Sequence, residues 1–184
     1  MGCHPLVHRT ALLAGLIIAA SGTATANSNP GAHQHGHANL QMAIEGHSIS
    51  LMLMSPAANL IGFEHQPHTD AEKQQLSDLV RWASDTPLIN TPEQRCLVTD
   101  SQLHTSWPQG GHHDHHQDHE ENSHGDIEIS QTLDCQGLGN SDQWSTPLMA
   151  EFPDIEQLDV QWVSPQGQGG TRLEHPASSF RIEH

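Results

Sequence analysis

Apolar residues occupy every second position in two neighbouring stretches near the start of the chain. These residues are Leu40, Met42 and Ile44, followed after Glu45-Gly46 by Ile49, Leu51 and Leu53. Successive side chains of a β-strand point to opposite faces, so this alternation predicts a β-hairpin. His33, His35 and His37 extend the same alternation toward the N-terminus. If the first strand begins early enough, these three histidines would share one face.

A helical period follows the hairpin. Thr69 and Glu72 have the spacing of a capping box, in which a hydroxyl and a carboxylate each bond the other residue's main chain. Apolar residues then recur at helical spacing: Leu76, Leu79, Val80 and Ala83. The pattern predicts an amphipathic helix from Asp70 to Ser84. Pro87 and Pro92 predict an irregular segment after it.

Two further apolar runs lie on either side of a polar stretch. The first covers Leu97–Leu103 and the second Ile127–Cys135. If they pair antiparallel with Cys96 opposite Cys135, Leu103 faces Glu128. The polar stretch between them then forms a long loop at the far end of the ladder.

The last third of the chain predicts several short elements. They are a short helix within Trp144–Phe152, a strand through Leu158, Val160 and Trp162, a turn from Pro165 through Gly170, and a weaker strand or tail over Arg172–Ile182. Together the patterns predict an α+β fold. We expect antiparallel β-sheet with one or two packing helices and a disordered His-rich loop.

The first 26 residues have the organisation of a secretory signal peptide. Arg9 supplies a short positive region, Ala11–Ala20 an apolar region, and Ala24-Thr25-Ala26 a small-residue cleavage site. The apolar region is too short to span a bilayer, and no twin arginine precedes it, which favours the general secretory route. We therefore predict a signal peptide at 1–26 and one metal-binding domain at 27–184, with no membrane insertion after cleavage.

The mature chain is strongly acidic. After loss of Arg9 it carries five basic and 22 acidic residues, a net charge of −17 with neutral histidines. This charge excludes nucleic acid as a partner. It also concentrates cations around the protein, although acidity alone equally serves solubility.

Two cysteines remain after cleavage, Cys96 and Cys135. A pair of cysteines in an exported chain predicts a disulfide, which would close a loop of 40 residues, counting both cysteines. The alternative, two thiolate metal ligands, lacks the paired spacing of a zinc ribbon.

Residues 107–124 form a His/Asp-rich insertion that has no apolar residue after Trp107 and Pro108. Its candidate ligands are His112, His113, His115, His116 and His119. Imidazoles mixed with carboxylates suit zinc, copper and nickel. Histidine binds metal when neutral, and its ordinary pKa is about 6.5, so binding should weaken as the pH falls. The alternative is a solvated low-complexity linker without a ligand.

A second set of metal-binding side chains lies outside this insertion, at positions that the patterns predict to be ordered. The set is His33, His35, His37, Glu64, His65, His68, His124 and Asp126. A tight zinc site needs three or four ligands on a rigid frame. Any one of these histidines could be surface decoration, but the set as a whole favours a shared site.

Motifs for catalysis are missing. A zinc-protease helix needs histidines four apart around a glutamate, but after His119-Glu120 the second histidine position holds Ser123. No nucleophile elbow or phosphate-binding glycine loop is present. We therefore expect a protein that is not an enzyme, with a metallohydrolase as the less favoured alternative.

Several short motifs, taken in order, resemble the ZrgA-like periplasmic zinc-binding proteins, small exported proteins with a histidine-rich insertion. The motifs are His35-Gly36-His37-Ala38-Asn39-Leu40, Pro56–His65 with its Gly-Phe-Glu-His end, Cys96, His124-Gly125-Asp126-Ile127, Cys135, Phe152-Pro153 and Val160-Gln161-Trp162. The resemblance covers nearly the whole mature chain.

The resemblance implies a periplasmic protein that binds Zn²⁺ and helps deliver it to an inner-membrane zinc ABC transporter. It also implies a buried site built from His35, His37, Glu64, His65, His124 and Asp126. The residues by themselves leave a copper or nickel buffer open as the rival function, because the intrinsic affinity of such a site favours copper(II) over zinc, and selectivity then depends on geometry and metal availability.

Overall fold

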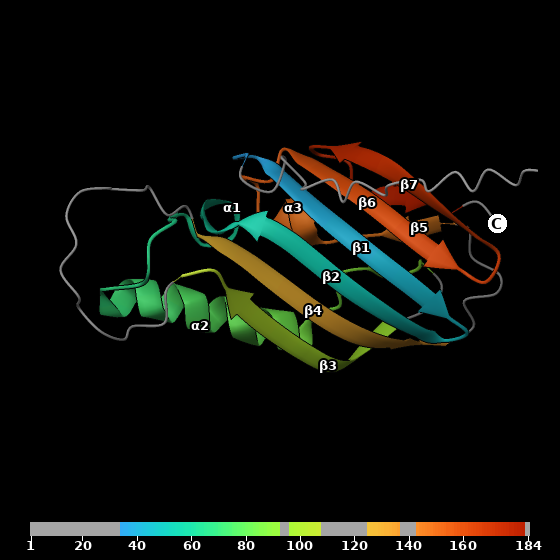
Figure 1. The fold of residues 1–184 in the computed structure, drawn as a ribbon, viewed down its shortest axis with the longest axis horizontal. Helices are drawn as coiled ribbons and strands as arrows, with labels where there is room; N and C mark the ends of the chain where they lie inside the picture. Colours follow the sequence, from blue (N-terminus) through green and yellow to red (C-terminus); the bar gives the residue numbers. More distant parts are fainter. Residues whose placement is uncertain (1–33, 93–95, 108–124, 137–142, 183–184) are drawn as a thin grey trace, which may run out of the picture.

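Six strands form one mixed β-sheet. The computed structural model describes residues 34–92, 96–107, 125–136 and 143–182. The strands of the large sheet are β1 (His37–Glu45), β2 (Ser48–Pro56), β3 (Cys96–Thr105), β4 (Asp126–Cys135), β6 (Gln157–Ser164) and β7 (Gly167–Glu174). Their order is β3-β4-β2-β1-β6-β7, as Figure 1 shows. The predicted signal peptide and all of the predicted loop except Trp107 lie outside the described residues.

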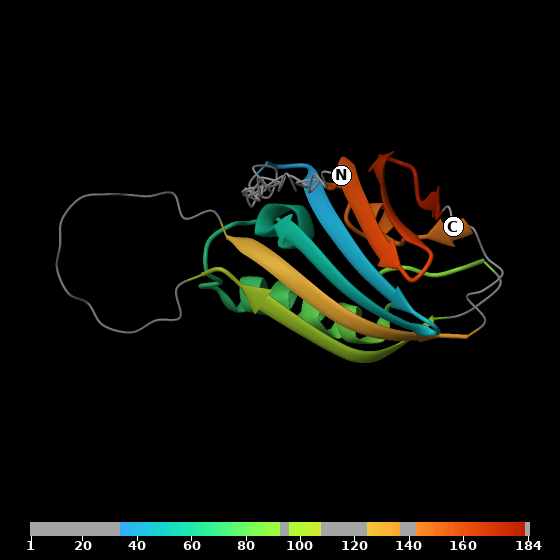
Figure 2. The ribbon, with the colours of Figure 1, turned by 45° about the vertical axis from the view of Figure 1, so that its right-hand side comes forward.

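Three helices and a small sheet cover one face of the large sheet. They are α1 (Ala57–Ile61), α2 (Asp70–Asp85), α3 (Leu148–Glu151) and the strands β5 (Gln143–Ser145) and β8 (Ser179–Arg181). Figure 2 shows α2 running along β3 and β4. Leu79 and Ala83 of α2 belong to the same buried core as Leu53 and Leu133 of the sheet. Within the described ranges, no helix is long and apolar enough to cross a membrane.

The predicted hairpin is confirmed, but its first strand does not begin early enough to place His35 and His37 on one face. Strands β1 and β2 pair antiparallel and end with Glu45 opposite Ser48. Gly36 has a φ of +79°, so the chain turns between His35 and His37 and the strand begins only at His37. Such a φ is rare for residues with a Cβ, which makes glycine the natural residue for this turn.

The predicted helix is also confirmed. It covers Asp70–Asp85, one residue more than expected, and Thr69 and Glu72 form the complete capping box. Leu79 and Ala83 are buried, but Val80 is 43% exposed, so the apolar face is narrower than its spacing predicts. Gln131 of β4 holds the other end of the helix, where its side-chain amide donates to the carbonyls of Ala83 and Thr86.

The capping box makes the stability of the protein depend on pH. The main-chain N–H groups of Thr69 and His68 donate to the Glu72 carboxylate and lower its pKa below the ordinary value of 4.5. The contribution of Glu72 to stability is therefore present above pH 4.5 and lost as the pH falls through the lowered value. In Glu72→Gln the amide accepts hydrogen bonds without titrating, so the Tm advantage of the wild type at pH 7 should shrink or reverse by pH 3.

Thermal unfolding of both proteins from pH 3 to 7 measures this difference. The same exchange at Glu45, an exposed residue at the end of β1, is the control. A Tm difference between wild type and Glu72→Gln that stays constant with pH would contradict the prediction.

The disulfide between Cys96 and Cys135 is confirmed, but the predicted strand register holds for only part of the ladder. Cys96 lies opposite Cys135, and the pairing shifts by one residue at a bulge between Val98 and Asp100. Leu103 therefore pairs with Ile129, not with Glu128 as predicted. A bulge inserts one unpaired residue and sends the following side chains to the opposite face.

The C-terminal third departs from the prediction in its boundaries. The predicted helix is shorter, because Trp144 lies in β5 and α3 begins at Leu148. The turn is limited to Pro165 and Gln166, and the glycines after it belong to β7. One of them has a steric role: a Cβ on Gly169 would lie 2.4 Å from the Trp162 ring.

The fold is α+β as predicted, except that the large sheet is mixed. Strands β1 and β6 pair parallel, and the other neighbours in the large sheet are antiparallel. Alternation along a strand says which face is buried but not which strands are neighbours. The arrangement places the start of β1 beside the end of β2 and helix α1, where the candidate site lies.

Candidate metal centre

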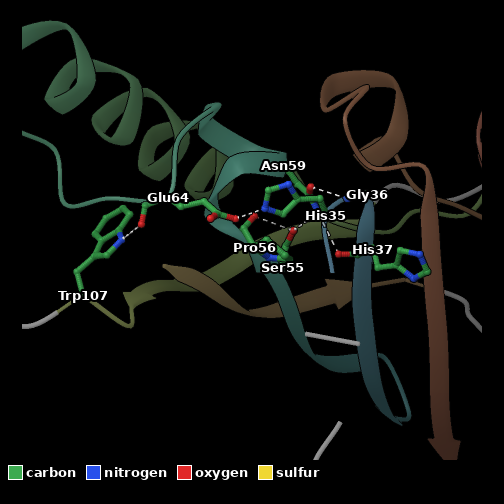
Figure 3. A network of polar contacts seen from close by, with 8 residues as sticks. All are labelled: His35, Gly36, His37, Ser55, Pro56, Asn59, Glu64 and Trp107. Carbon is green, nitrogen blue, oxygen red and sulfur yellow. Dashed lines mark hydrogen bonds and ion pairs between the residues drawn. The ribbon is translucent and has the colours of Figure 1, made fainter. Parts of the chain in front are cut away.

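An imidazole and a carboxylate meet where the chain enters β1. His35 Nε2 lies 2.5 Å from Glu64 Oε1. Figure 3 marks this contact with a dashed line. His35 lies in the turn before β1, and Glu64 lies in the loop after α1. The His35 side chain is 64% exposed and that of Glu64 only 18%. The pair therefore combines a largely buried carboxylate with a solvent-accessible imidazole.

Asn59 of α1 fixes the backbone around His35. Its side-chain oxygen accepts from Gly36 N at 2.9 Å, and its amide nitrogen donates to His37 O at 3.0 Å and Ser55 Oγ at 3.1 Å. Asn59 is only 4% exposed. One buried side chain thus holds the backbone on both sides of the turn that presents His35.

Two donors hold the main chain of Glu64. Its carbonyl accepts from Trp107 Nε1 at 2.6 Å and from Gly125 N at 3.0 Å. A Cβ on Gly125 would lie 1.9 Å from Trp107 Nε1 and 2.5 Å from the Glu64 carbonyl oxygen. Only glycine allows the three groups to approach this closely.

The donor types of the pair fit zinc, but the pair is not a complete site. Zinc binds imidazole nitrogen and carboxylate oxygen at about 2.0–2.2 Å in tetrahedral geometry, which separates two ligand atoms by about 3.3 Å. His35 and Glu64 would have to move apart by less than about 1 Å to accept the ion. Among the described residues, no group of three or more His, Cys, Asp or Glu side chains could hold a metal ion. His35 and Glu64 would thus supply two of the four ligands.

The structure places three other predicted ligands away from this pair. The ring of His37 points away from Glu64, toward β6, in Figure 3. His65 turns to the start of α2: its ring stacks on Phe63 at 5.1 Å and on His68 at 5.6 Å, and its Nε2 lies 3.8 Å from Glu72 Oε1.

Asp126 lies beside the centre through its backbone but faces a different pocket. It follows Gly125 at the start of β4, and its N–H donates to Ser106 Oγ at 2.8 Å. Asp126 lines a surface pocket of about 270 Å³ together with Met54, His104 and Glu128. The sequence patterns did not single out His104, because the bulge in β3 decides which face it shares with Glu128.

The remaining predicted ligands lie outside the described residues. They are His33, His112, His113, His115, His116, His119 and His124. Two of them adjoin the centre in sequence, since His33 stands two residues before His35 and His124 directly precedes Gly125. Their participation stays a prediction.

Comparison with known proteins places the chain in the range of a family model. The model of the family described as ZrgA family zinc uptake protein matches residues 32–182. No curated protein is significantly similar to the chain. The matched range contains the His35–Glu64 pair, Asn59, Trp107, Gly125 and both cysteines.

Proposed function

We propose a function in zinc delivery from the family of the chain, which belongs to the ZrgA family of zinc uptake proteins. In this proposal the protein binds Zn²⁺ in the periplasm and passes the ion to an inner-membrane ABC transporter. Zinc is then cargo rather than a resident cofactor. The observation that carries the proposal is the contact between His35 Nε2 and Glu64 Oε1, which brings a nitrogen and an oxygen ligand together in the matched range. His33 and His124 are the predicted ligands that would complete the coordination.

Three features support a location outside the cytoplasm. Residues 1–26 have the organisation of a signal peptide. Cys96 and Cys135 form a disulfide, and such bonds persist mainly in oxidising compartments such as the periplasm. The high negative charge favours encounter with cations there.

Carriage without catalysis fits the accessibility of the pair. A carrier has to release its ion, and most of the His35 side chain is exposed to solvent. A zinc hydrolase would instead need an open coordination position next to a general base. We accordingly propose a binding protein, with the His-rich stretch 107–124 collecting further ions.

Substitution of the pair tests the proposal. In His35→Ala and in Glu64→Gln we expect the tightest zinc affinity of the mature chain to fall at least tenfold. The reason is that loss of a residue that only hydrogen-bonds a metal ligand already lowers metal affinity about 10–100-fold, and here a ligand itself is lost. Competition with a chromophoric chelator at neutral pH measures this affinity without interference from weaker sites in the insertion.

His47→Ala is the matched control. His47 is also an exposed histidine beside a carboxylate, 3.9 Å from Asp134, but it lies at the hairpin turn at the other end of β1. Its loss should change neither zinc affinity nor growth of cells under zinc limitation, whereas His35→Ala should impair both. Wild-type zinc affinity in both pair variants would refute the assignment of the site, and a mature chain without saturable zinc binding would refute the function.

A further inference from the structure

Both residues that flank the segment 108–124 bond the same acceptor. Trp107 precedes this segment and Gly125 follows it. Each donates to the carbonyl of Glu64, at 2.6 and 3.0 Å. The carboxylate of the same Glu64 contacts His35. Glu64 thus connects His35 to both flanks of the segment 108–124.

The indole of Trp107 is held firmly enough to act on Glu64. Trp107 is only 6% exposed, and its ring stacks on Phe63 with centroids 6.5 Å apart and planes 13° from parallel. Phe63 directly precedes Glu64, so the stacking and the hydrogen bond act on adjacent residues. Gly125 is tied in turn to the start of α1, because its carbonyl accepts from Ala57 N at 2.7 Å.

We infer that Trp107 is a positioning residue for zinc binding by His35 and Glu64, and that its indole N–H senses whether the pair is occupied. The inference rests on the proposed function and adds a role for a residue that cannot itself bind zinc. Because the main chain of Glu64 is held in place, only the side chains of His35 and Glu64 have to move when zinc binds. Such preorganisation by supporting hydrogen bonds strengthens metal binding.

Trp107→Phe tests the positioning role, because it keeps an aromatic ring against Phe63 and removes the N–H donor. We expect the tightest zinc affinity to fall about tenfold, the lower end of the range for outer-shell partners. Trp82→Phe is the matched control, since Trp82 likewise packs against a phenylalanine, Phe152, with ring centroids 4.8 Å apart. Its zinc affinity should equal that of the wild type.

Gly125→Ala disturbs the same acceptor from the other side, because its Cβ would overlap the indole nitrogen. If both residues act through the Glu64 carbonyl, the double variant should bind zinc about as weakly as the weaker single variant, instead of showing the product of the two effects.

A measurement on the unmodified mature chain is independent of whether these variants fold. In a zinc titration followed by NMR, the indole N–H resonance of Trp107 should shift with the first equivalent, more than those of Trp82, Trp144 and Trp162. In His35→Ala that shift should disappear.

The outcomes separate this inference from the proposed function. If His35→Ala weakens zinc binding but Trp107→Phe does not and the Trp107 resonance stays still, the positioning role is refuted and the zinc site stands. If His35→Ala and Glu64→Gln both leave the affinity unchanged, the site itself is refuted, and the inference fails with it.

Discussion

Replacing Cys96 and Cys135 together by alanine is expected to lower the free energy of unfolding by about 4 kcal/mol. The two cysteines are 39 residues apart in sequence, and both are buried. A crosslink between such distant residues removes much of the conformational freedom of the unfolded chain, by an amount that depends on loop length. Urea unfolding of the oxidised wild type and the double variant measures the difference.

Zinc binding provides the control for this prediction. The disulfide joins β3 and β4 where Cys96 faces Cys135, whereas Gly125 meets Glu64 at the opposite end of β4. Zinc affinity of the folded double variant should therefore match that of the wild type. Reduction of the wild type should reproduce the loss of stability. A double variant within 1 kcal/mol of the wild type would contradict the expected contribution of the crosslink.

The parts of the fold that the sequence predicts well depend on neighbouring residues. Thr69 and Glu72 specify the start of α2 because both partners of the capping box lie within one helical turn. The β1–β2 hairpin is similarly local, with a two-residue turn between strands of clear alternation.

The features that the sequence did not predict depend on contacts between distant segments. Nothing in the alternation of β1 indicates that it pairs parallel with β6, more than a hundred residues later. The pattern also gives no sign of the bulge between Val98 and Asp100. This bulge changes the pairing partner of Leu103 from the predicted Glu128 to Ile129. The glycines after Pro165 suggest a turn, but Gly169 instead accommodates the ring of Trp162 within a strand pair.

The candidate site shows the same division. Residue chemistry indicates His35 and Glu64 as ligands, because imidazole and carboxylate are ordinary zinc donors. It does not indicate which histidines converge, and the structure directs His37 and His65 elsewhere. The supporting frame is still harder to predict, since Trp107 and Glu64 are 43 residues apart in sequence. A tryptophan at the border of a polar stretch, with a glycine at its other border, was the only available signal.

Asn59→Leu is expected to lower the free energy of unfolding by about 3 kcal/mol and also to weaken zinc binding. Leucine has the same branching and the same number of heavy side-chain atoms as asparagine but makes none of its three hydrogen bonds to Gly36, His37 and Ser55. A buried main-chain group left without its partner costs about 1–3 kcal/mol. Urea unfolding measures the first effect, and chelator competition on the folded variant measures the second.

The two effects have a common cause but separate readouts. Gly36 N and His37 O are main-chain groups on either side of the turn that presents His35, so releasing them frees His35 from its place beside Glu64.

Asn39→Leu is the matched control: it is the same exchange on β1, at a residue whose side chain has no hydrogen bond to the described part of the chain. A stable Asn59→Leu variant with weakened zinc binding would assign to Asn59 only the placing of His35. A destabilised variant with wild-type zinc affinity would instead mean that His35 reaches its position without Asn59, and that the turn before β1 is held by Gly36 and the main-chain bonds of its carbonyl to Glu156 and Gln157.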